Sequence, residues 1–145
     1  MNPLSAERAE ALAQLCDRFH VDILYIFGSR AGEVREWLAG HRPDLPPGPA
    51  DVDAGVKVAP GVQLSVRDKV CLALALEDLL GVTRVDLVCL AGADPFLAAN
   101  IIRGERLYVR DAYQADEYDL YVLRRAGDLA PLERERMALI LGEEG

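Results

Sequence analysis

The sequence predicts a single domain of the α/β (α+β) class, a small mixed β-sheet with helices packed on it. Short apolar or alternating segments, typical of strands, are separated by segments in which apolar residues recur at helical spacing. The chain has 145 residues, about the size of one domain, and 51% of them are hydrophobic. The predicted order of elements is α, β, α, β, α, β, α, β, α.

The first three elements are a helix, a strand and a helix. Ser5 suits the N-cap of the first helix, whose apolar residues recur at helical spacing as far as Phe19. The run "DILYIF", Asp22–Phe27, is short, continuously apolar and rich in aromatic and β-branched residues, which is typical of a central strand. From Ser29 to about Leu38 the pattern becomes helical again.

The middle of the chain is predicted to contain a loop, a strand, a helix and a second strand. Gly40–Pro49 has four prolines and two glycines and reads as a stiff inserted loop. Ala50–Val58 alternates in polarity, as a half-buried strand does. A helix is expected from Ser65, which opens a capping box, to Leu80. Arg84–Leu90 then alternates like a strand.

The last predicted elements are a short helix, an edge strand and a C-terminal helical region. Asp94 caps a helix that Gly104 ends, and "ERLYVR" is a short edge strand. From Asp111 the composition is helical, with a break expected between Gly127 and Pro131.

These elements divide the chain into a main domain and an extension of it. Residues 1–112 are predicted to form the domain, with the proline-rich insertion at about 40–50. Residues 113–145 are predicted to form a C-terminal helical extension packed on the same domain.

Composition excludes several classes of function. The net charge of −8 argues against a nonspecific electrostatic grip on DNA or RNA, so no direct binding of nucleic acid is expected. No apolar run approaches the ~20 residues that span a bilayer, and the polar N-terminus is unlike a signal peptide. A cytoplasmic protein with no membrane contact is therefore expected.

Three carboxylates stand at positions where strands would bring them together. Asp51 and Asp53 are two residues apart on one strand and so share a face, and Asp86 lies on the polar face of the next. If these strands are neighbours, the three acids converge, and like charges at close range require a cation between them. Hard oxygen ligands suit Mg²⁺ or Mn²⁺. Two such ions support phosphoryl or nucleotidyl transfer.

A possible phosphate site precedes the acids in "YIFGSRAG", Tyr25–Gly32. Gly28 would let a phosphate approach the backbone, Ser29 would offer a hydroxyl and an amide at a helix N-terminus, and Arg30 would add positive charge. The alternative from the same residues is a plain tight turn. In that alternative the three acids are solvated and pair with Lys57 and Arg84.

With all of these motifs present, the segment from Val21 to Asp111 resembles the minimal nucleotidyltransferases of the polymerase-beta superfamily. The resemblance implies a small mixed sheet with helices on one side. It implies transfer of a nucleoside monophosphate, with ATP as substrate and Mg²⁺ or Mn²⁺ as cofactor, to a hydroxyl, with release of pyrophosphate.

The resemblance also assigns roles to individual residues. Gly28 and Ser29 match the phosphate-binding pair, and Asp51 and Asp53 match the metal-binding acids. Asp86 matches the third acid, which binds one metal and helps to activate the incoming hydroxyl.

The same resemblance implies partners. Many stand-alone members are antitoxins that silence a HEPN-type RNase toxin by adding AMP to it. Two alternatives stay open: an antitoxin-like protein that acts by occlusion without catalysis, and an enzyme that modifies a small molecule such as an aminoglycoside. A homodimer also stays open. The chain departs from the family in the 21 residues between Ser29 and Asp51, an insertion that would form a flap over the nucleotide, contact a partner or decorate the edge.

Overall fold

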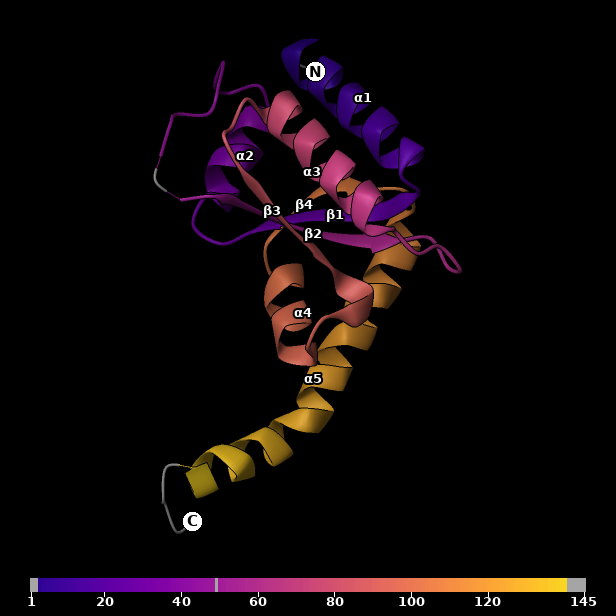
Figure 1. Ribbon diagram of the computed structural model, residues 1–145, viewed down its shortest axis with the longest axis vertical. Helices are drawn as coiled ribbons and strands as arrows, with labels where there is room; N and C mark the ends of the chain where they lie inside the picture. Colours follow the sequence, from indigo (N-terminus) through magenta and orange to yellow (C-terminus); the bar gives the residue numbers. More distant parts are fainter. Residues whose placement is uncertain (1–2, 49, 141–145) are drawn as a thin grey trace.

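The computed structural model describes residues 3–48 and 50–140 and contains a four-stranded mixed sheet (Figure 1). The strand order is β3-β2-β1-β4, with β1 antiparallel to both β2 and β4 and β2 parallel to β3. The strands are β1 Val21–Phe27, β2 Val52–Val58, β3 Val85–Cys89 and β4 Glu105–Val109. The predicted class and the predicted edge position of the last strand are confirmed.

Helices cover both faces of this sheet. They are α1 Pro3–Arg18, α2 Ala31–Leu38, α3 Val66–Leu80, α4 Pro95–Ile102 and α5 Ala112–Ile140, with a short 3₁₀ turn, η1, at Leu90–Gly92. Figure 1 shows α1, α2 and α3 on one face and α4 and α5 on the other. The expectation of helices on one side only is therefore wrong. In the described part of the chain, no helix is both long and apolar enough to cross a bilayer.

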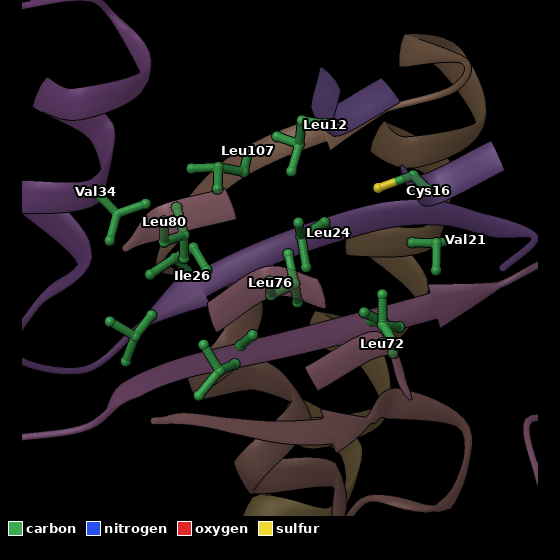
Figure 2. Packing of buried hydrophobic residues seen from close by; sticks show 14 of the residues in the cluster. Leu12, Cys16, Val21, Leu24, Ile26, Val34, Leu72, Leu76, Leu80 and Leu107 are labelled. Carbon is green, nitrogen blue, oxygen red and sulfur yellow. The ribbon is translucent and has the colours of Figure 1, made fainter. Parts of the chain in front are cut away.

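The predicted strand Asp22–Phe27 corresponds to β1, which is buried on both faces. Leu24 and Ile26 face the core that α1, α2 and α3 cover, and Figure 2 shows them among side chains of α1 and α3. Ile23 and Tyr25 face the second core, under α4 and α5. Both sets are almost completely buried. A strand that is buried on both faces must be apolar at every position rather than at alternate ones.

Capping residues in the sequence predicted the starts of α3 and α4 correctly, but not the start of α1. Ser65 and Asp68 form the predicted capping box, and the Asp94 carboxylate accepts from the backbone N–H of Phe96 at 2.8 Å. However, α1 already begins at Pro3, so Ser5 lies inside the helix and is not its N-cap. Proline is well suited to the first turn of a helix because its missing N–H would have no partner there.

The C-terminal helix α5 is continuous where a break was expected. It runs through Gly127 and Pro131, although a proline removes one backbone hydrogen bond, and Figure 1 shows it curving in its second half. In its first half, Ala115, Val122 and Ala126 are buried in the second core, together with residues of α4 and β1. Beyond them the large side chains of Leu132, Met137, Leu139 and Ile140 are exposed. Residues 141–145 of that extension lie outside the described residues.

Gly104 joins α4 to β4 at a point of very close backbone packing, which leads to a stability prediction. A methyl group at this position would collide with the carbonyl oxygen of Ile26 and lie 3.0 Å from Cβ of Phe27. We expect Gly104→Ala to lower the free energy of unfolding by about 1–3 kcal/mol. Gly127→Ala is the control, because nothing lies within 4 Å of its added Cβ in α5. Urea unfolding would contradict the prediction if the two variants were equally stable.

Candidate active site

The turn after β1 is shaped by a glycine and touches a carboxylate. Gly28 has φ of +79°, the left-handed region that glycine adopts without strain. A Cβ placed on Gly28 would lie 2.5 Å from Oδ2 of Asp53, so the backbone of the turn lies directly against that carboxylate. Ser29 is exposed in the same turn. The helix starts at Ala31, two residues later than the sequence pattern indicated.

Strand pairing brings two of the three predicted acids side by side. Asp53 is opposite Phe27 of β1 and opposite Asp86 of β3, so it lies between the Gly28 turn and the third acid. Asp51 comes immediately before β2, at the same edge of the sheet. The expectation that these strands are neighbours is confirmed, and the reason is the parallel pairing of β2 with β3.

The acids affect one another electrostatically. Burial raises the pKa of Asp53 above its ordinary value, and the nearby charges of Asp86 and then Asp51 raise it further. Among residues 3–48 and 50–140, however, no three His, Cys, Asp or Glu side chains form a ready cluster for a metal ion. Carboxylate oxygens are the ligands that Mg²⁺ and Mn²⁺ prefer, so the residue types fit these ions. The carboxylates lie next to one another but do not converge on one point.

The raised pKa of Asp53 predicts how stability changes with pH in the absence of metal. The folded state disfavours the ionised form of Asp53, because its pKa is raised there. The free energy of unfolding therefore falls as pH rises from the ordinary pKa of 3.8 to the folded pKa, and does not change further above it. We therefore expect Asp53→Asn to be more stable than the wild type at pH 7.5 in EDTA, and no more stable near pH 3.8. Urea midpoints at the two pH values measure this. Equal midpoints at both would contradict it.

Of the two ion pairs expected if the acids were solvated, the one with Arg84 forms and the one with Lys57 does not. Nε of Arg84 lies 3.5 Å from Oδ2 of Asp51. Lys57, in contrast, pairs with Asp22 at 3.5 Å and not with the acids of the site. Sequence reasoning gave Arg84 no role in the proposed site beyond that alternative, although it lies two residues before Asp86 and immediately before β3.

Arg30 is anchored in the inserted loop. Its guanidinium donates to the carbonyl oxygen of Pro46 at 2.5 Å and to that of Ala50 at 3.5 Å, and it pairs with Glu33 at 3.1 Å. The side chain is buried. Its donors are directed to the loop and to Glu33, and its place beside a phosphate stays a prediction.

A second arginine holds the other end of the insertion. Arg8 of α1 donates to the carbonyl oxygens of Trp37, Arg42 and Pro43 at 2.5, 2.8 and 2.6 Å. Its guanidinium also lies 4.4 Å from the centre of the Trp37 ring, a cation–π contact. Leu45 of the loop is buried in the core. The insertion is therefore fixed to the domain at several points.

The anchored loop forms one wall of a cavity of about 360 Å³ that reaches Asp51. The opposite wall is the turn between α3 and β3. The lining residues are Arg30, Leu45, Pro46, Pro47, Gly48, Ala50, Asp51, Gly81, Val82, Thr83 and Arg84. Because Asp51 also lines this cavity, the insertion lies next to the candidate site.

Comparison with known proteins places this fold among solved structures. No protein-family model and no curated protein matches the sequence. A structure described as a minimal nucleotidyltransferase is similar with 32% identity and a TM-score of 0.50, over 68% of this chain and 87% of that chain. A toxin–antitoxin structure with AMP-PNP is similar with 19% identity and a TM-score of 0.65, over 91% and 94% of the two chains. A complex of the tri-AMPylated Shewanella oneidensis HEPN toxin with an MNT antitoxin is similar with 22% identity and a TM-score of 0.60, over 94% and 95%.

Proposed function

Since this chain belongs to the minimal nucleotidyltransferase family, we propose that it transfers AMP from ATP to a hydroxyl of a partner protein and releases pyrophosphate. The observation that carries this proposal is the contact between the Gly28 turn and Asp53, with Asp86 as the opposite neighbour of Asp53. A phosphate-binding turn and a pair of carboxylates on adjacent strands are what transfer at a nucleotide phosphate requires.

Each residue of the site has a proposed task. The Gly28–Ser29 turn would bind phosphate oxygens of the nucleotide, with the backbone N–H groups at the start of α2 oriented toward the anion. Asp51, Asp53 and Asp86 would hold Mg²⁺ or Mn²⁺. When bound, the cation would neutralise charge on the α-phosphate, which is transferred with AMP, and on the leaving pyrophosphate. Asp86, on the far side of Asp53 from the turn, would accept the proton of the attacking hydroxyl.

The proposed partner is a HEPN-type toxin. Two of the similar structures are toxin–antitoxin complexes, and one contains a toxin that carries AMP. Modification of a small molecule is the weaker alternative, because both of these similar structures pair an antitoxin with a protein toxin. A cytoplasmic location, as expected from the sequence, belongs to the same proposal.

The first test is binding of nucleotide in the absence of any acceptor. Isothermal titration with AMP-PNP, with and without Mg²⁺, would compare the wild type with the double variant Asp51→Asn/Asp53→Asn. We expect binding that requires Mg²⁺ in the wild type and is lost in the variant. A wild type that binds no AMP-PNP in Mg²⁺ would contradict the proposal.

The second test identifies the acceptor. ATP labelled at its α-phosphate would be incubated with the protein and the product of the adjacent reading frame, and we expect label on that product with the wild type only. Inhibition of the toxin by the double variant, without label, would instead favour neutralisation by occlusion. The exposed apolar residues in the second half of α5, Leu132, Leu139 and Ile140, give that alternative a surface with which to bind.

A further inference from the structure

Arg84 and Asp51 lie side by side where β3 and β2 begin. The backbone N–H of Val52 donates to the carbonyl oxygen of Arg84 at 3.2 Å, which fixes the two chain segments next to each other. Each residue comes immediately before its strand, two positions before the register pair Asp53–Asp86. Arg84 therefore places a positive charge beside the acids, on the side away from the Gly28 turn.

The ion pair between them is weak enough to be exchanged. Nε and Oδ2 are 3.5 Å apart, which is long for a charge-assisted hydrogen bond, and 70% of the Arg84 side chain and 41% of the Asp51 side chain are exposed. Exposed pairs of this kind change an equilibrium constant by about fivefold at most. A divalent cation carries twice the charge and would compete for the same carboxylate.

Other basic side chains near the site are held more firmly. Arg30 is buried and hydrogen-bonded to the inserted loop, and Lys57 pairs with Asp22. Arg84 differs because its contact is with one of the proposed metal ligands. If a metal ion binds that carboxylate, the guanidinium of Arg84 loses its ion-pair partner.

We propose that Arg84 exchanges partners as the site is loaded. In the free protein it neutralises Asp51, and once a divalent cation has bound Asp51 it binds a phosphate oxygen of the nucleotide. This inference rests on the proposed function. It assigns Arg84 to phosphate binding from the side opposite the Gly28–Ser29 turn, so that the phosphates are held between the two. The planar guanidinium is well matched to phosphate oxygens.

The exchange predicts opposite effects of one substitution on two equilibria. Arg84→Ala should bind Mn²⁺ alone about two- to fivefold more tightly than the wild type, because the competing cation is gone. The same variant should bind AMP-PNP in saturating Mn²⁺ about three- to tenfold more weakly, because a charged hydrogen bond to phosphate is lost. Isothermal titration measures both constants, with Mn²⁺ as the probe in one and AMP-PNP in the other.

Two variants make the result specific. Arg67→Ala removes the same charge at an exposed position near the start of α3, whereas Arg84 follows the end of that helix. It should change neither binding constant. Arg84→Lys retains the charge without the planar fork and should lie between the wild type and Arg84→Ala. Circular dichroism would verify that all variants are folded.

The outcomes separate this inference from the proposed function. Tighter Mn²⁺ binding with weaker AMP-PNP binding supports the exchange. If Arg84→Ala changes Mn²⁺ affinity alone, changes AMP-PNP affinity alone, or behaves like Arg67→Ala, the exchange is wrong and the proposed function stands. If the wild type binds neither Mn²⁺ nor AMP-PNP, the proposed function fails, and the exchange fails with it.

Discussion

Replacement of Asp53 by asparagine is expected to slow AMP transfer by about a thousandfold or more. Asp53 contacts the Gly28 turn on one side and is paired in register with Asp86 on the other, so it is the central carboxylate of the proposed site. A metal ion at such a site contributes several kcal/mol of transition-state stabilisation, and ~4 kcal/mol corresponds to a factor of about a thousand. The measurement is the initial rate of label transfer from ATP to the partner.

The control for this substitution is Asp128→Asn, an equivalent change of charge at an exposed position on α5. It should retain the wild-type rate. Because Asp53→Asn is expected to be as stable as the wild type or more so at neutral pH, a loss of rate would not result from unfolding. A rate for Asp53→Asn within tenfold of the wild type would remove Asp53 from the catalytic group.

Gly28→Ala is expected to abolish Mg²⁺-dependent binding of AMP-PNP and to destabilise the protein by about 1–2 kcal/mol. The loss of stability follows from φ of +79°, which disfavours any residue with a Cβ. The loss of binding follows from the added methyl group, which would lie 2.5 Å from Oδ2 of Asp53 and must displace that carboxylate or the turn. Thermal unfolding and isothermal titration measure the two effects.

Gly61→Ala separates these two causes. Gly61 has φ of +80°, nearly the same as Gly28, but nothing lies within 4 Å of its added Cβ. It should therefore share the loss of stability and retain nucleotide binding. If both variants kept the binding of AMP-PNP, the Gly28 turn would not be a phosphate site.

The parts of the fold that could be predicted depend on short-range rules. The apolar run of β1 and the alternation in β2 follow from which faces are buried, and the Ser65 capping box joins residues three apart. The shared face of Asp51 and Asp53 follows from the two-residue repeat of a strand. Such signals are contained in a few neighbouring residues, so one sequence is enough to show them.

The parts that could not be predicted depend on distant contacts. Arg8 binds carbonyl oxygens about thirty residues away, and Arg30 binds those of the same insertion from the other side. Backbone acceptors have no sequence signature, so neither anchor was visible beforehand. The passage of α5 through Pro131 and the second layer of helices were missed for a similar reason, because tertiary packing decided them.

The position of the acids in the strand order divides the site into a rigid and an adaptable half. Asp53 lies on β2, which is hydrogen-bonded along both sides, whereas Asp86 lies on β3, an outer strand paired on one side only. The half that would bind nucleotide is thus fixed in the interior of the sheet. The half that would meet the acceptor lies at its open margin, where an acceptor would reach Asp86 without crossing another strand.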